Sequence, residues 1–358
     1  MVSMHMAGTH LCQNCQCLLW ALNLKTRWRV DLRIHCLGGG LVGSFVTRKL
    51  VEAGFDVHLY DVIERKTNAT FHLEDALQAN HDLADFVVNM LPGSLGNQMT
   101  SILKDSNLKI VDLSFSETTP DTLTEISNSI LWDVGIAPGL SNMLVAMAVR
   151  EFGTLDEVTI KVGGNPAQPD GEWSYMAPFS PYDVIAEYTR PARIISNGEK
   201  VSAPAISELH SIDANGREMD AFLTDGLRSL LNLPVQNMGE YTVRWPGHIQ
   251  KYQESELNPD ELVEAWKMDP AKAEFTWMEV FIKAGEKAQR WIVEDNGKGS
   301  DSSMARTTGL VTASCVIAWV DRPQMFGSGV FAPEDLPNEV IELVIEVMRS
   351  EGVSIELQ

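Results

Sequence analysis

Three glycines near the start of the chain have the spacing of a phosphate-binding turn. They follow a short apolar run, residues 34–37, and precede a segment with helical periodicity, residues 44–53. In a G-x-G-x-x-G turn the first glycine makes the tight bend, the second lets a pyrophosphate approach, and the third lets helix pack on strand. Unpaired N–H groups at the start of the helix then face the phosphates. The predicted phosphate-binding residues are Gly38, Gly40, Leu41, Val42 and Gly43.

An acidic residue ends the next expected strand, residues 56–61, where a dinucleotide-binding unit needs one. Asp61 lies roughly 20 residues beyond the glycines, and its carboxylate would accept hydrogen bonds from the adenosine ribose. The same carboxylate would repel a 2′-phosphate, which favours NAD, whereas Arg65 leaves NADP open. We therefore predict a nicotinamide dinucleotide cofactor, with NAD favoured over NADP.

The charge balance of the chain argues against nucleic acid as a partner. The 358 residues carry a formal net charge of -21, and no cluster of lysine and arginine forms a local basic patch. No apolar run approaches the roughly 20 residues that a transmembrane helix requires. We expect a cytoplasmic protein that acts on a small molecule and has neither nucleic acid nor a membrane as a partner.

The N-terminal segment, residues 1–32, concentrates soft side chains. One histidine and three cysteines lie within residues 10–17, but a structural zinc site normally uses a second, distant pair of ligands. The apolar run 18–22 is short for a signal peptide and no lysine or arginine precedes it. We interpret the segment as a disordered extension and predict no bound metal.

Strands and helices alternate over residues 33–145. Strands are expected at 34–37, 56–61, 85–91, 108–114 and 130–134, and helices at 44–53, 72–80, 93–104 and 119–128. This alternation predicts a Rossmann-type, doubly wound parallel sheet, whose ligands bind outside the carboxyl ends of the strands. Loops 89–93, 114–116 and 135–139 should therefore border the nicotinamide. Further cofactor contacts are expected from Asn89, Leu91 and Pro92, although Asn89 fits a side chain that caps its own loop almost as well.

Beyond residue 145 the strands are separated mainly by turns. Strands are expected at 159–163, 193–196, 241–245, 279–284 and 290–294, helices at 180–188 and 259–266, and hairpins at 197–198 and 285–287. Residues 146–300 are predicted to form an inserted α+β substrate and dimerisation domain with a mostly antiparallel sheet. Two helices within residues 301–358 should return to the Rossmann domain, which places the site in the cleft between the domains.

Several separated motifs occur in a characteristic order. They are Gly38-Gly-Gly-Leu-Val-Gly43, Asp133-Val-Gly-Ile-Ala-Pro-Gly139, Val162-Gly-Gly-Asn-Pro166, the run from Phe179 to Tyr188, Arg244-Trp-Pro-Gly-His248 and Arg306-Thr-Thr-Gly309. They resemble the saccharopine dehydrogenase family, and within it the L-lysine 6-dehydrogenases, over about nine tenths of the chain. The resemblance implies a homodimeric, pyridine-nucleotide-dependent enzyme that removes hydride from a carbon bearing an amine.

Such an enzyme must fix a distant carboxylate and accept the proton of the amine. Arg244 is the candidate for binding the substrate carboxylate, because a planar guanidinium can form two parallel hydrogen bonds to a carboxylate. The alternative is a salt bridge between Arg244 and an acidic residue of the protein. His248 follows a Pro-Gly turn and is a candidate base or, equally, a surface histidine. The hydroxyls of Tyr175 and Ser180 could orient the substrate, although Tyr175 also fits an aromatic residue of the core.

The resemblance also favours a small substrate. Ala137 stands where the glutamate-forming saccharopine enzymes carry an acidic residue, which points to lysine or a close relative rather than saccharopine. Pro138 and Gly139 should shape the pocket for the substrate and the nicotinamide. Asp183 and Glu187 lie one helical turn apart, and we interpret them as a solvated helix face in preference to an amine-binding site.

Two other functions stay open. A reductase that forms a secondary amine, as in saccharopine or carboxynorspermidine synthesis, would need a second buried cation besides Arg244, and Lys161 and Arg193 are candidates. Lys161 or water also stays open as the base. A non-catalytic dinucleotide-binding regulator would keep residues 38–61 but would not need Arg244 and His248 near the nicotinamide.

Overall fold

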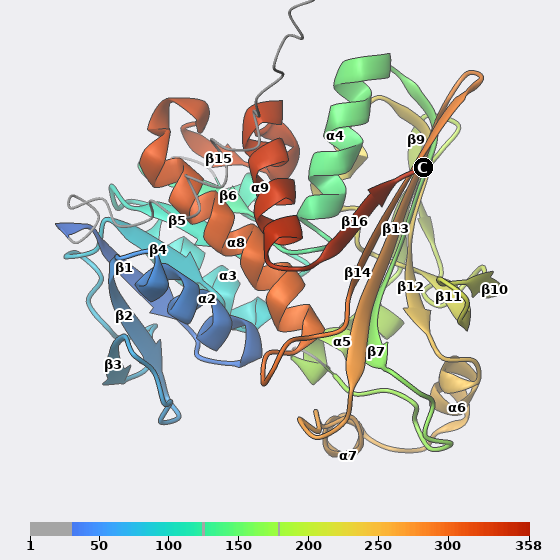
Figure 1. The fold of residues 1–358 in the computed structure, drawn as a ribbon, viewed down its shortest axis with the longest axis horizontal. Coiled ribbons are helices and arrows are strands. Elements are labelled where there is room, and N and C mark those ends of the chain that lie inside the picture. Colours follow the sequence, from blue (N-terminus) through green and yellow to red (C-terminus); the bar gives the residue numbers. More distant parts are fainter. Residues whose placement is uncertain (1–30, 124–125, 178–179) are drawn as a thin grey trace, which may run out of the picture.

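The computed structural model describes residues 31–123, 126–177 and 180–358. It contains two sheets, and helices α4, α8 and α9 lie between them (Figure 1). The bounds of these helices are Leu140–Phe152, Ser303–Asp321 and Asn338–Ser350. None of the described helices combines the length and the apolar composition that crossing a membrane requires. The predicted N-terminal extension lies outside the described residues, apart from Asp31 and Leu32.

The first sheet has seven parallel strands in the order β15-β6-β5-β4-β1-β2-β3. Their bounds are β1 Arg33–Leu37, β2 Asp56–Asp61, β3 Thr70–Leu73, β4 Phe86–Asn89, β5 Lys109–Asp112, β6 Ser129–Trp132 and β15 Gly329–Phe331. The order of the first six strands is that of a Rossmann fold, as predicted. Helices α2, Leu41–Glu52, and α3, Gly93–Leu103, follow β1 and β4.

The second sheet has nine strands and is antiparallel except where β12 pairs with β7. Their bounds are β7 Leu155–Pro166, β8 Ala192–Ser196, β9 Glu199–Ala203, β10 His210–Asp213, β11 Glu218–Thr224, β12 Val235–Arg244, β13 Glu274–Ala284, β14 Lys287–Asp295 and β16 Ser354–Leu357. Helices α5, Pro181–Thr189, α6, His248–Glu254, and α7, Pro259–Ala265, accompany it. Both predicted hairpins are present, as β8–β9 and β13–β14.

The C-terminal segment contributes to both halves of the molecule. Helix α8 packs against α2, and β15 pairs with β6 at the edge of the Rossmann sheet. Strand β16, however, pairs with β14 in the second sheet. The sequence predicted the two helices but neither strand, because each is only three or four residues long and pairs with a distant partner.

Two helices expected between the Rossmann strands are absent from the described residues. The segment 72–80 begins with the end of β3, because His72 stacks on Tyr60 with ring centroids 4.4 Å apart and hydrogen-bonds to His58. In the segment 119–128, whose residues 124–125 are not described, only the short turn Pro120–Thr122 is helical. The hydroxyl of Thr122 there donates to the carbonyl oxygen of Thr119, and such side-chain bonds compete with helix formation.

Candidate active site

A cavity of about 580 Å³ lies between the carboxyl ends of the Rossmann strands and the face of the second sheet. One part, called here the glycine-turn part, is lined by residues of the 38–43 and 60–65 segments. The other, called the β12 part, is lined by residues of β7, α5, the 224–226 segment and β12. The two parts meet at the loop after β6 and at α8. The cleft between the two sheets therefore brings together most of the candidate functional residues that lie in the described part of the chain.

The glycine turn has the geometry that the sequence predicted. A Cβ on Gly43 would lie 2.0 Å from the carbonyl oxygen of Gly38, so only glycine allows α2 to approach β1 this closely. A Cβ on Gly40 would meet nothing within 4 Å, which leaves open space at the start of the helix. No acidic side chain lies in the first turn of α2, and none of the described side chains caps it. Its free N–H groups can therefore bind an anion.

Asp61 is fixed in place beside this turn. Its carboxylate accepts hydrogen bonds from the backbone N–H of Gly39 at 2.6 Å and of Ile63 at 2.8 Å. Arg65 also donates to it, at 3.2 Å, and its side chain is one-third exposed. Both residues line the cavity, so both stay candidates for contact with the adenosine ribose or a phosphate on it.

The other residues predicted to bind cofactor and substrate divide into two groups. Leu91, Pro92, Pro138 and Ser180 line the cavity. Asn89 does not: it is fully buried and donates to the carbonyl oxygen of Gly96 and to Asp112, so it caps its own loop rather than a ribose.

Gly139 also lies behind the cavity wall. A Cβ on it would lie 1.9 Å from the carbonyl oxygen of Gly135, and its φ of +136° is one that other residues rarely adopt. Its role is to let the 135–139 loop fold back on itself, which presents Pro138 to the cavity. This agrees with the predicted shaping of the pocket but places the contact on the neighbouring residue.

Arg244 lies at the end of β12 and lines the cavity, although only 3% of it is exposed. Its Nε donates to the hydroxyl of Tyr188 at 2.8 Å, Nη1 to the carbonyl oxygen of Val243 at 2.9 Å, and Nη2 to the hydroxyl of Tyr175 at 3.4 Å. Among the described residues no carboxylate lies within ion-pair distance of it. A buried guanidinium without an anion is costly, which makes Arg244 the natural site for a ligand carboxylate.

His248 and Tyr175 lie behind Arg244 and not in the cavity wall. His248 is 2% exposed, and since its Nδ1 lies 3.0 Å from the carbonyl oxygen of Trp173, Nδ1 carries the proton. Its Nε2 then accepts from the hydroxyl of Tyr188, whose oxygen accepts from Arg244. Burial and the neighbouring Arg244 lower the pKa of His248 to about 3. His248 therefore does not fit the predicted role of base, and it positions Arg244 through Tyr188.

Tyr175 packs its ring against the same guanidinium. The Arg244 carbon lies 4.3 Å from the centre of the Tyr175 ring, which provides a cation–π contact. Burial raises the pKa of its hydroxyl to about 12, so this group stays protonated at neutral pH. The structure thus places Tyr175 among the aromatic core residues that support Arg244, which was the alternative to its predicted catalytic role.

Asp183 and Glu187 do not form a solvated helix face, and that interpretation was wrong. Both line the cavity from α5. Asp183 accepts from the backbone N–H of Gly93, the first residue of α3, at 3.3 Å, and burial raises its pKa. Burial raises the pKa of Glu187 to about 7, although Arg244 opposes this shift. The spacing in the sequence shows that both carboxylates lie on one face of α5. It does not show whether that face meets the cleft or the solvent.

A further carboxylate, which the sequence did not single out, projects from β12 into the cavity. Glu240 is 5% exposed, and its Oε2 has no hydrogen-bond partner among the described residues. Burial, reinforced by the charges of Glu187, Asp225 and Asp133, raises its pKa to about 8. A usable signal was present, because Glu240 and Arg244 stand four positions apart on one strand and so on one face.

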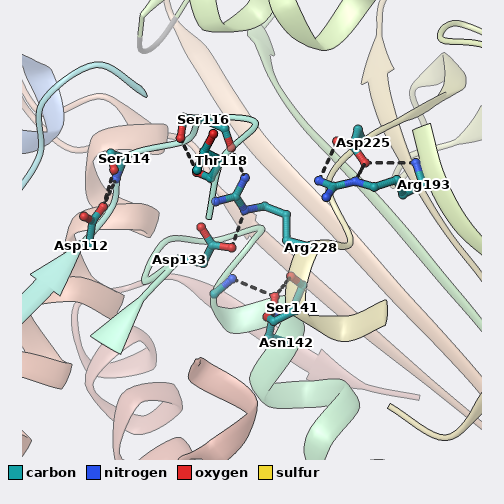
Figure 2. Close-up of polar contacts among 12 residues, drawn as sticks. Asp112, Ser114, Ser116, Thr118, Asp133, Ser141, Asn142, Arg193, Asp225 and Arg228 are labelled. Atoms are coloured by element: carbon teal, nitrogen blue, oxygen red, sulfur yellow. Dashed lines mark hydrogen bonds and ion pairs between the residues drawn. The ribbon is translucent and has the colours of Figure 1, made fainter. Parts of the chain in front are cut away.

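The remaining charges around the β12 part are neutralised within the protein. Figure 2 shows Arg228 reaching to Asp133 at 2.5 Å and Arg193 reaching to Asp225 at 2.8 Å. Lys161, the other predicted second cation, pairs with Glu279 at 2.8 Å. Neither Lys161 nor Arg193 lines the cavity, so neither supplies the second cation that saccharopine would require. In the part of the chain that the structure describes, no group of His, Cys, Asp or Glu is arranged to hold a metal ion.

The comparisons with known proteins agree with this geometry. The sequence profile of the saccharopine dehydrogenase C-terminal domain matches residues 135–353. The chain belongs to the saccharopine dehydrogenase family. The family predicted from the sequence motifs is therefore confirmed, as is the Rossmann-type sheet with a second, mixed sheet.

Solved structures with a similar fold include saccharopine dehydrogenase (L-Glu forming) from Saccharomyces cerevisiae in its apo form. The TM-score is 0.70 at 13% identity, covering 91% of this chain and 99% of that one. Diaminopimelate (DAP) dehydrogenase of C. glutamicum, in complex with DAP, has a TM-score of 0.45 at 10% identity, covering 87% and 96% of the two chains. At these identities the yeast structure establishes a shared fold.

Proposed function

We propose that this protein is a nicotinamide-dinucleotide-dependent oxidoreductase that oxidises the CH–NH bond of an amino acid with one carboxylate, L-lysine or a close relative. The observation that carries the proposal is the isolated charge of Arg244. It is the only described basic side chain that lines the β12 part of the cavity, and no carboxylate of the described protein pairs with it. The guanidinium is therefore available to a carboxylate of the substrate.

The charges around Arg244 favour a substrate that also carries amines. Five carboxyl groups line this part of the cavity or its border with the glycine-turn part: Asp133, Asp183, Glu187, Asp225 and Glu240. Arginines neutralise Asp133 and Asp225, but the other three have no basic partner within ion-pair distance among the described residues. A substrate such as saccharopine, with carboxylates at both ends, would place negative charge beside these groups. Lysine would place its ammonium groups there instead.

The residues of the glycine-turn part fit a nicotinamide dinucleotide. The open space at Gly40 and the uncapped start of α2 suit a pyrophosphate, and Asp61 is positioned for a ribose. The cofactor would supply the hydride acceptor. Asp61 favours NAD, and Arg65 keeps NADP as a second cofactor to be tested.

The test is a spectrophotometric screen of the purified protein. Reduction of NAD and NADP is followed with lysine, ornithine, saccharopine and 1,5-diaminopentane, and the Arg244→Ala variant is measured beside the wild type. We expect lysine to reduce NAD and the variant to lose this activity. Reaction with saccharopine alone would replace the proposal by a secondary-amine dehydrogenase. Tight NAD binding without turnover of any amine would favour a non-catalytic dinucleotide-binding regulator.

A further inference from the structure

We propose that Glu240 binds the reacting amine of the substrate and accepts its proton, with Glu187 as the neighbouring acceptor for the same ammonium group. This inference rests on the proposed function and adds the identity of the base to it. It is carried by the position of Glu240 on β12, by the lack of a hydrogen-bond partner for its Oε2 among the described residues, and by the groups packed around it.

The position of Glu240 relative to Arg244 fits an extended substrate. Glu240, Thr242 and Arg244 alternate along β12 and all line the cavity, so they share one face of the strand. A strand rises about 3.3 Å per residue, which places the Cα atoms of Glu240 and Arg244 about 13 Å apart. A substrate bound along this face would place its carboxylate on Arg244 and its far amine near Glu240.

The Glu240 end is also the end that faces the Rossmann sheet. Asp133, on the loop after β6, contributes to the electrostatic environment of Glu240, and Arg228 pairs with Asp133. Loops at the carboxyl ends of parallel strands border the ligand in Rossmann folds. An amine at Glu240 is therefore close to the part of the cavity where the redox chemistry is expected.

The protein leaves the Glu240 carboxylate unpartnered and makes room for it. Its Oε2 has no hydrogen-bond partner among the described residues, although the residue is 95% buried. A Cβ on Gly226 would lie 1.5 Å from Glu240 Oε1, so the glycine allows the carboxylate to occupy this place. A buried carboxyl group without a partner is costly and points to a ligand that completes it.

The groups that face Glu240 come from four elements and set its protonation. Glu187 of α5, Asp225 after β11 and Asp133 after β6 oppose its ionisation, whereas Arg228 of the 3-10 helix Arg228–Asn232 favours it. Burial opposes ionisation further, and together these effects raise the pKa of Glu240 to about 8. Burial is the largest cause of both shifts, which raise the pKa of Glu187 to about 7 and that of Glu240 to about 8.

The proton balance follows from this chemistry. The ammonium form of the substrate must lose a proton before hydride can leave, because the nitrogen lone pair forms the C=N bond. The ionised Glu240 takes this proton, which gives a neutral amine and a carboxylic acid. The cofactor, when bound, would supply the acceptor for the hydride of the C–H bond, and water would hydrolyse the resulting iminium to an aldehyde and ammonium. Glu240 returns its proton to solvent.

The first experiment compares Glu240→Gln with the matched control Glu264→Gln, which alters an exposed glutamate of α7. We expect Glu240→Gln to lower kcat/KM for lysine at least 100-fold while NAD affinity stays within about twofold. The wild-type kcat/KM should rise with pH around the pKa of about 8 for Glu240. In the variant the rise should move toward the ordinary pKa of a primary amine, about 10.4. Activity within threefold of wild type, or an unchanged pH profile, would overturn the inference while leaving the proposed function intact.

A second experiment tests the amine site without turnover. Isothermal titration of 6-aminohexanoate into the protein without NAD, at pH 7 in two buffers of different ionisation heat, counts protons exchanged on binding. We expect proton release in the wild type, because the ammonium group binds the ionised carboxylates, and a smaller release in Glu240→Gln, where Glu187 alone of the two loses a proton. Equal proton release from both proteins would contradict the inference. If release is smaller in the variant but the wild type oxidises no amine, Glu240 is an amine site and the proposed function fails.

A third variant keeps the Glu240 carboxylate but moves it. Gly226→Ala places a Cβ where Glu240 Oε1 lies, so the carboxylate must shift. We expect at least a tenfold loss of kcat/KM with unchanged NAD affinity and a pH profile that keeps its rise near pH 8. An unaltered kcat/KM in the folded variant would mean that the placement of this carboxylate is irrelevant.

Discussion

Two buried arginines of the cleft, Arg228 and Arg244, differ in how their positive charge is compensated. Arg228 has no exposed side-chain surface, pairs with Asp133 and donates to the carbonyl oxygen of Ser116 (Figure 2). Arg244 is equally buried but has only tyrosine hydroxyls and a carbonyl oxygen as partners among the described residues.

The difference separates a structural charge from one that is kept for a ligand. The Arg228 pair joins the loop after β6 to the 3-10 helix Arg228–Asn232, although Nη2 of Arg228 has no hydrogen-bond partner among the described residues. The environment of Arg244 holds its side chain in place through Tyr188, His248 and Tyr175 without cancelling its charge. Oriented neutral partners therefore position Arg244, and the substrate supplies the anion.

The largest expected effect comes from removing the unpaired charge. Arg244→Met should lower kcat/KM for lysine about 1000-fold, since a buried carboxylate would lose its charged partner. It should leave thermal stability nearly unchanged, because no protein carboxylate is orphaned. The control substrate is 1,5-diaminopentane, which has no carboxylate and should react equally with both proteins. A similar loss with this diamine would mean that Arg244 does not bind the carboxylate.

The paired arginine should show the reverse pattern. Arg228→Met leaves Asp133 buried without a cation, and we expect the free energy of unfolding to fall by about 3 kcal/mol. Urea unfolding at pH 7.5 measures this loss. The double variant Arg228→Met/Asp133→Asn should recover part of it, because the orphaned charge is removed. A variant as stable as the wild type would abolish the distinction between the two arginines.

The carboxylates of the cleft also divide into paired and unpaired groups, and the pH dependence of stability distinguishes the two. Hydrogen bonds from Arg193 lower the pKa of Asp225 despite its burial, whereas the pKa of Glu240 is raised to about 8. The pKa of Glu240 is 4.5 in the unfolded chain and about 8 in the folded protein. Its contribution to the free energy of unfolding is therefore fully present below pH 4.5 and is lost as the pH rises through 8. Glu240→Gln should therefore be about 2 kcal/mol more stable than wild type at pH 9 and equal to it at pH 4. Thermal unfolding at the two pH values provides the measurement. A variant that is less stable at pH 9 would show that the ionised carboxylate has a stabilising partner.

The smallest effect extends the comparison to Arg65, which is paired with Asp61 as Arg228 is with Asp133. Asp61→Ser would free this guanidinium and remove the negative charge that opposes a 2′-phosphate. We expect the ratio of NADP to NAD affinity to rise about tenfold, which corresponds to about 1.4 kcal/mol. Fluorescence titration of both reduced cofactors gives the ratio. Arg65→Met in the same background should cancel the gain if the freed arginine causes it.

The sequence predicted the Rossmann sheet well because its signals are local. The glycine spacing, the alternation of strands and helices, and the acid at the end of β2 each lie within a short stretch of chain. The helix expected over residues 72–80 failed because contacts between β2 and β3, such as the stacking of His72 on Tyr60, override local propensity.

The site was only partly predictable, because the features that define it depend on contacts between distant segments. Arg244 could be found as a charge inside an apolar strand, but its lack of an anionic partner becomes visible only when the chain is folded. Glu240 is one of 49 acidic residues, and its spacing of four positions from Arg244 is the local signal that could have singled it out. Its burial, its neighbours and the glycine at 226 come from separate segments, and no local pattern reports on them.

Strand β15 has a consequence for the order in which the molecule is made. Ser129 of β6 pairs with Gly329, which the ribosome adds 200 residues later. At about 5–20 residues per second, the edge of β6 stays without its partner for about 10–40 s during synthesis. The loop after β6, which carries Asp133, therefore adjoins an open sheet edge until the end of the chain emerges. A chaperone that shields this edge would act during translation, and a ribosome stalled before residue 329 would hold a Rossmann sheet of six strands.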